Sequence, residues 1–301
     1  MSFRSFVPYL GMIFLMLTTG VVSLQLIVPI THAGIGAFED PNSIENPFVF
    51  MFIMLVFTAL LLLLIKWKAQ IIISALIGTS IALVIYYVVS ALIYSYSAKL
   101  PSSFIGVVTA ISVLILLWYW PEWYIIDGVG ILISAGCAAI FGISLSIIPV
   151  LILLILLIVY DAISVHRTKH MLTLADGVLH QKMPIMFIIP KTHNYSYWNS
   201  KFSLQDSRDE RGAYMIGMGD MILPSILVVS AQIYTGGEAS LSVAGMALPA
   251  LGALIGGLIG LCSLMIPLNS GKPQSGLPYI NTGVIIGFLV CSAIAGSWTW
   301  I

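Results

Sequence analysis

The chain has 301 residues, of which 59% are hydrophobic and only 8% are charged, and its mean hydropathy is +1.06. Soluble domains carry about 25% charged residues, so this composition excludes a water-soluble globule. The formal net charge is zero, which gives no indication of a nucleic-acid partner. We therefore expect an integral multi-pass protein of the lipid bilayer, in the cell membrane if the source is prokaryotic.

A membrane-spanning helix needs about 20 mostly apolar residues. The first apolar run is longer than a signal-peptide core and has no convincing cleavage site, so we treat it as a retained span. The fifth and sixth spans are separated only by Ser144, Ser146 and Pro149. Nine spans are predicted in total, at residues 6–30, 48–65, 71–94, 101–118, 128–145, 149–165, 212–234, 241–266 and 279–300.

The distribution of basic residues supports this number, because cytoplasmic loops carry the excess of Lys and Arg. With nine spans and a cytoplasmic N-terminus, every Lys and Arg except Lys99 is cytoplasmic. Merging the fifth and sixth spans into one would place the basic residues of 167–211 on the opposite side of the membrane from Arg4, which the same rule disfavours. We therefore predict one all-α polytopic membrane domain over residues 1–301, with a cytoplasmic loop at 166–211 and the C-terminus outside.

Two carboxylates lie inside predicted spans, where charged side chains are costly and usually functional. Asp161 lies near the cytoplasmic end of the sixth span, roughly 8 Å deep by helix rise. Asp220 lies nine residues after Arg211 on the antiparallel seventh span, hence roughly 13 Å deep from the same face. Helix tilt absorbs such a difference, so the two carboxyl groups are expected to face each other.

Two carboxyl groups that share a site do not both ionise readily, so one stays protonated while the other acts as a base. Such a pair activates a water molecule and protonates a carbonyl oxygen, as in aspartic proteases. Gly217 and Gly219 leave room beside Asp220 for a substrate backbone or a facing helix. The structural alternative is that an intramembrane Asp only hydrogen-bonds a neighbouring helix.

Other polar and small residues are assigned structural roles. Asp127, at the predicted start of the fifth span, is expected to be an interfacial carboxylate favoured by the helix dipole. His166 and His170 are interpreted as part of a basic juxtamembrane cluster, and no metal site or cofactor is expected. The cysteines and the glycine ridge are expected to pack within the membrane, although the ridge leaves a homo-oligomer open; these residues are Cys137, Cys262, Cys291, Gly252, Gly256 and Gly260.

Tyr160-Asp161 on a sixth span, followed by Gly217-Met218-Gly219-Asp220 on a seventh, resembles the presenilin and signal peptide peptidase family of GxGD intramembrane aspartyl proteases. The resemblance extends over essentially the whole chain and suggests a microbial presenilin-like homologue. It implies that Asp161 and Asp220 are the catalytic pair and that the residues around them form their setting.

The family's third motif, Pro-Ala-Leu, occurs literally at residues 249–251. That position is about 25 Å from the cytoplasmic end of the eighth span, so we interpret it as a decoy. The family carries this motif at the cytoplasmic start of the last span. There the chain has Ser275, Gly276, Leu277 and Pro278, which resemble a degenerate PALP with the first proline lost and glycine in place of alanine.

The resemblance also implies substrates. A presenilin-like orientation predicts transmembrane peptide or protein substrates that enter with their N-termini outside. Residues 184–190 (PIMFIIP) form a proline-bounded, β-branched run that predicts an edge strand. Family membership implies that a substrate strand pairs with this region before cleavage.

The same two aspartates are also compatible with a different class of function. A cation channel or proton-coupled transporter would use Asp161 and Asp220 to bind or relay ions. A transporter of this kind often has inverted repeats with broken helices, and no such internal symmetry is apparent. The prediction is therefore an intramembrane aspartyl endopeptidase, with the channel or transporter as the alternative.

Overall fold

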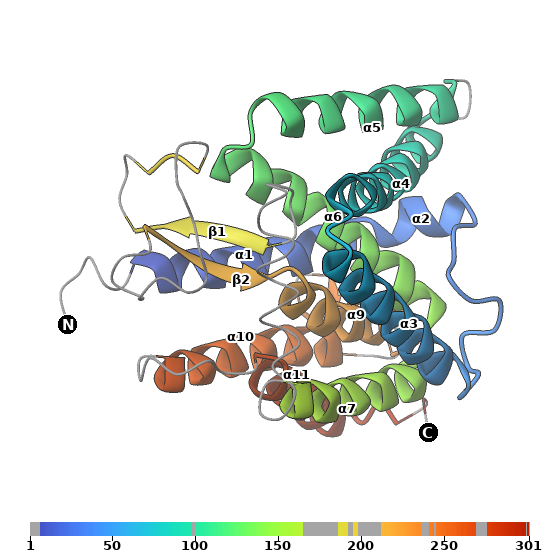
Figure 1. Cartoon of the computed structure of the whole chain (residues 1–301). Coiled ribbons are helices and arrows are strands. Elements are labelled where there is room, and N and C mark those ends of the chain that lie inside the picture. The colour runs from blue at the N-terminus through green and yellow to red at the C-terminus, as the bar shows by residue number, and fades with distance from the viewer. Residues whose placement is uncertain are drawn as a thin grey trace.

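The computed structural model describes residues 7–97, 100–164, 186–191, 195–197, 212–235, 241–243, 245–268, 276–298 and 300. Helices dominate this part of the chain (Figure 1). The helices are α1 (Val7–Gln25), α2 (Ile27–His32), α3 (Asn46–Lys66), α4 (Gln70–Tyr96), α5 (Ser102–Tyr119), α6 (Trp123–Ser144), α7 (Ile147–Ile163), α9 (Gly219–Tyr234), α10 (Leu248–Leu268) and α11 (Leu277–Ala295). The strands are β1 (Met186–Pro190), β2 (Ala213–Gly217), β3 (Ser242–Val243) and β4 (Met246–Ala247).

Within the described residues, seven helical segments are long and apolar enough to cross a membrane. The first of them combines most of α1 with α2, and the others are α3, α4, α5, α6, α10 and α11. The helices α7 and α9 are apolar but have only 17 and 16 residues. The predicted helical membrane fold is therefore confirmed, whereas the side of the membrane on which each terminus lies stays a prediction.

The predicted seventh span begins too early. Residues 213–217 form β2 rather than a helix, and α9 begins at Gly219. Tyr214 and Ile216 favour a strand, and the flanking glycines are poor helix formers. Asp220 is thus the second residue of α9, so the depth estimated from a helix starting at Gly212 is wrong.

The predicted eighth span also begins too early. The hairpin of β3 and β4 occupies the segment before Leu248, where α10 begins. The Pro-Ala-Leu sequence at 249–251 is therefore in the first turn of α10. Proline is tolerated there because the first amide groups of a helix have no intrahelical acceptor.

The strand predicted within 184–190 is confirmed as β1, while its first two residues lie outside the described part of the chain. It pairs with β2 in antiparallel register, with Phe187 opposite Ile216 and Ile189 opposite Tyr214. The two strands lie beside α1 and α6, and β2 runs directly into α9 (Figure 1).

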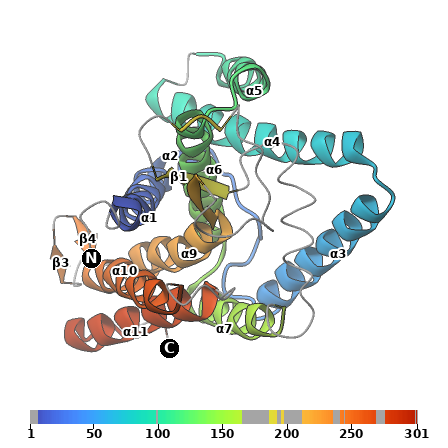
Figure 2. The ribbon, with the colours of Figure 1, turned by 60° about the vertical axis from the view of Figure 1, so that its left-hand side comes forward.

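The helix α9 lies at the centre of the fold, surrounded by α1, α6, α7 and α10 (Figure 2). All of its residues from 223 to 231 are buried. In contrast, α3 and α5 expose most of their apolar side chains, as expected for helices that face lipid. The helix that carries Asp220 is therefore the most enclosed element of the described structure.

The glycine ridge of α10 packs inside the chain, as predicted. Gly256 lies against the carbonyl group of Gly283, and Gly252 lies against that of Gly287. Any side chain at these positions would overlap the backbone of α11, so the glycines allow the two helices to approach closely. This contact fixes the position of α11, whose first residues belong to the candidate site.

Candidate active site

The two intramembrane aspartates come from neighbouring helices. Asp161 lies in the last turn of α7 and is 3% exposed, and Asp220 lies partly buried in the first turn of α9. These helices pack against each other. The two carboxyl groups interact electrostatically, so the structure brings together the pair that the sequence singled out.

Both carboxyl groups meet the same end of α11. The backbone N–H of Leu277 donates to Asp161 Oδ2 at 3.3 Å. A methyl group built on Gly276 would lie 2.9 Å from Asp220 Oδ2. Gly276 is the N-cap of α11 and has no side chain for capping, so Asp161 accepts from the first helical amide instead. The positive end of the helix dipole also favours a carboxylate there.

The glycines of the GxGD sequence leave open space in this structure. A methyl group on Gly219 would have nothing within 4 Å, and one on Gly217 would contact Asp220 Oδ2 at 3.7 Å, an ordinary van der Waals distance. Met218 is 7% exposed, and its Cε lies 3.3 Å from a methyl group built on Gly130 of α6. Met218 thus anchors the segment, while the glycines keep the approach to Asp220 open.

The remaining predicted site residues lie at different distances from the aspartates. Tyr160 precedes Asp161 on α7 and is partly buried. Pro278 follows Leu277 in the first turn of α11. Ser275 lies outside the described residues. The segment 249–251 lies in the first turn of α10, whereas α10 contacts Tyr279 at the start of α11 through Gly260, about three turns further along. It therefore does not reach the pair.

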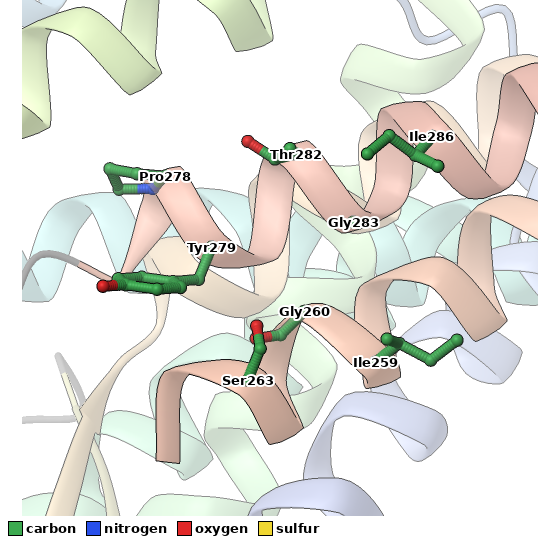
Figure 3. Close-up of a pocket in the computed structure, with 8 residues that line it drawn as sticks. All are labelled: Ile259, Gly260, Ser263, Pro278, Tyr279, Thr282, Gly283 and Ile286. Atoms are coloured by element: carbon green, nitrogen blue, oxygen red, sulfur yellow. The ribbon is translucent and has the colours of Figure 1, made fainter. Parts of the chain in front are cut away.

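A groove of about 360 Å³ lies beside Pro278 on the seam between α10 and α11 (Figure 3). Its rims include Ile259 and Ile286, which are 63% and 56% exposed. No aspartate lines it, so the groove is a surface feature next to the candidate site. Within the described residues there is also no cluster of three potential metal ligands, and His166 and His170 lie outside them.

Sequence reasoning missed the support for the site on α6. Asp127 was expected at an interface, but it lies in the second turn of α6, is 9% exposed, and accepts the Ile188 N–H at 2.8 Å. The predicted fifth span began at residue 128, whereas α6 begins at Trp123. Asp127 was therefore placed at the end of the helix, although it lies within it. The sequence signal for this role was a carboxyl group without an obvious partner next to an apolar run. Only the tertiary structure brings β1 to this group.

Comparison with solved structures identifies two close neighbours in fold. A presenilin family intramembrane aspartate protease solved in space group C222 is 38% identical, with a TM-score of 0.71, and the match covers 96% of this chain and 100% of that chain. The same kind of protein in space group P2 is 39% identical, with a TM-score of 0.70 and coverage of 96% and 99%. No curated protein sequence matches at a significant level.

The family model for signal-peptide peptidase and presenilin aspartyl protease matches residues 12–297, which is nearly the whole chain. Together with the helical membrane fold, this match makes the protein an integral multi-pass membrane enzyme of the aspartic endopeptidase type. The chain belongs to the signal peptide peptidase and presenilin family of intramembrane aspartyl proteases.

Proposed function

We propose that this enzyme hydrolyses peptide bonds within transmembrane segments and that Asp161 and Asp220 are its catalytic pair. The observation that carries the proposal is the convergence of both carboxyl groups on Gly276 and Leu277 at the start of α11. The start of a third helix thus lies against both acidic groups and donates a hydrogen bond to one of them.

The pair supplies both roles that hydrolysis requires. Because two adjacent carboxyl groups share one proton, one acts as a base toward water while the other donates a proton to the peptide carbonyl oxygen. Water adds to the carbonyl carbon, and the C–N bond then breaks as the departing nitrogen takes up a proton. Each aspartate is therefore essential in this scheme, which uses no metal ion or cofactor.

The edge of β2 away from β1 has no strand partner among the described residues, and it is the proposed place for the substrate backbone. The backbone N–H of Lys191 donates to the carbonyl oxygen of Gly212, so these residues form a hydrogen-bonded pair. The pairs of Ile189 with Tyr214 and Phe187 with Ile216 continue this ladder. In an antiparallel ladder the intervening peptide groups point away from the partner strand, so those of Met215 and Gly217 point to the other edge. A substrate strand added there would end beside Asp220.

We further propose one polytopic domain over residues 1–301 with nine spans, including α7 and α9, and a cytoplasmic N-terminus. The basic residues of 166–211 support a cytoplasmic loop between α7 and α9. Substrates would enter with their N-termini outside. A homo-oligomer remains compatible with this arrangement, because the exposed faces of α3 and α5 are free for lipid or protein.

The test is cleavage of a purified single-span substrate in liposomes, with product masses and ion flux read from the same preparation. Asp161→Asn and Asp220→Asn should each abolish cuts within the span, whereas Asp40→Asn, an exposed loop control, should not. Cleavage that survives both substitutions would refute the pair. Ion flux that depends on both aspartates, without any proteolysis, would favour the channel or transporter.

A further inference from the structure

Two acidic residues at the start of α6, Asp127 in its second turn and Glu122 at its N-cap, bind β1 and the residues that follow it. Asp127 Oδ1 accepts the N–H of Ile188 at 2.8 Å, and this bond is buried. Glu122 accepts the Ser196 hydroxyl at 2.7 Å through Oε1 and the Tyr197 N–H at 3.1 Å through Oε2. Residues on both sides of the segment that follows β1 are thus tied to one helix.

The bond from Asp127 occupies the outer edge of β1. Phe187 and Ile189 belong to the pairs bonded to β2, so the peptide N–H of Ile188 points away from β2. Its acceptor is a carboxyl oxygen of Asp127, so this outward N–H of β1 is satisfied by α6 and not by another strand. A carboxylate on this edge also prevents a further strand from pairing there.

The same face of α6 reaches the GxGD segment. A methyl group on Gly130 would lie 2.9 Å from Phe187 Cε1 and 3.3 Å from Met218 Cε, so the bare backbone of α6 receives both side chains. Met218 lies between β2 and Asp220 in the chain. Moving β1 on α6 would therefore move β2 and the start of α9 with it.

The residues beyond β1 are packed as well as bonded. Tyr197 is 5% exposed and shares a buried cluster with Ile126 of α6 and Ile188 of β1. Burial, together with a smaller contribution from the neighbouring Tyr195, raises the pKa of the Tyr197 phenol to about 12. The phenol is thus neutral at physiological pH, which suits its apolar surroundings.

We infer that Asp127 is a positioning residue for proteolysis, which closes the outer edge of β1 and fixes the strand pair, so that a substrate strand adds only to β2 and in one register. This inference rests on the proposed function. Asp127 does not contact the reacting atoms, and it influences which peptide bond is cut through its effect on β1 and β2.

A purely stabilising role predicts a different result. If Asp127 only stabilised the fold, its loss would lower the melting temperature and the rate but leave the cuts at the same bonds. A positioning role predicts that the cuts redistribute over neighbouring bonds, because the strand that aligns the substrate is no longer held. The ratio of product masses therefore separates the two roles.

The experiment uses the full chain in liposomes with a single-span substrate and compares Asp127→Asn, Asp127→Ala and Asp127→Glu. The Asn variant keeps an oxygen acceptor at Oδ1 and should keep the wild-type product ratio. The Ala variant loses the acceptor and should lower kcat/KM by about tenfold and spread the cuts. The Glu variant keeps a carboxylate on a longer side chain, displaces β1, and should also spread them.

Two controls keep the outcomes distinct. Ile30→Val, at a buried site on α2 in a cluster that contains no strand residue, should lower the melting temperature without changing the product ratio. If the Ala variant does not fold, the Glu variant carries the test. Unchanged product ratios in the folded Ala and Glu variants would overturn the inference while leaving the proposed function intact. Wild-type cleavage that is insensitive to Asp161→Asn and Asp220→Asn would instead overturn the proposed function.

Discussion

Gly276 has no side chain, and the Asp220 carboxyl group lies close to the position that a side chain there would occupy. A methyl group there would lie 2.9 Å from Oδ2 and 3.2 Å from Cγ, which is tighter than real contacts of this kind. The family motif that this segment resembles has alanine at the equivalent position. The absence of the side chain therefore leaves room for the Asp220 carboxyl group beside the start of α11.

We predict that Gly276→Ala lowers kcat by about threefold to tenfold, because Asp220 must move by a few tenths of an ångström from its productive position. The measurement is the cleavage rate at saturating substrate. Gly128→Ala is the matched control, since a methyl group on that exposed helical glycine meets nothing within 4 Å. Equal rates for both variants would mean that Asp220 is not held against Gly276 during catalysis.

Asn281 is a buried polar residue of α11 near the candidate site. It follows Leu277 by one turn of α11, is fully buried, and neither its Nδ2 nor its Oδ1 has a partner in the described structure. We predict that Asn281→Leu, which has a similar branched shape, raises stability by about 1–3 kcal/mol. Thermal denaturation measures the effect, and a lower melting temperature would show that the amide has a partner in the membrane.

At the scale of elements, β1 and β2 form the part of the fold that interrupts the helical pattern. The sequence predicted β1 because prolines bound this run and the run itself is rich in β-branched residues. It did not predict β2, because AYMIG is apolar enough to be read as the start of a span. Pairing with β1 outweighs this apolarity, since each strand satisfies backbone groups of the other.

We predict that Met215→Pro raises KM for a transmembrane substrate by about tenfold, because it removes one outward N–H from the open edge of β2 without removing a bond to β1. Met215→Ala is the control, since it changes the side chain and keeps the N–H. Steady-state kinetics of both variants decide the matter. If the two variants bind substrate equally well, the edge of β2 is not the docking strand.

At the scale of the whole molecule, the contacts of the candidate site join helix ends that the nine-span topology puts on one side. The start of α6, the end of α7, the start of α9 and the start of α11 all meet in this region. This agreement supports the alternation of directions along the chain.

We predict that the loops alternate as the basic residues indicate. In a protein with its native cysteines replaced by serine, an impermeant maleimide should label Ser43→Cys from outside intact cells and label Ser203→Cys only after the membrane is opened. The physical reason is that the positively charged loop at 166–211 is retained in the cytoplasm. The opposite labelling pattern would invert the topology and the expected orientation of substrates.

The sequence by itself determined the membrane class and the order of the apolar segments, and it singled out Asp161 and Asp220 as a candidate pair. Apolar length and the rarity of intramembrane carboxylates are local properties, which need no knowledge of the fold. Only the tertiary structure decided that α9 starts at Gly219, that β2 precedes it, and that Asp127 binds Ile188. These features depend on pairing between segments about 30 to 60 residues apart, where backbone hydrogen bonds override the local preference of an apolar sequence for a helix.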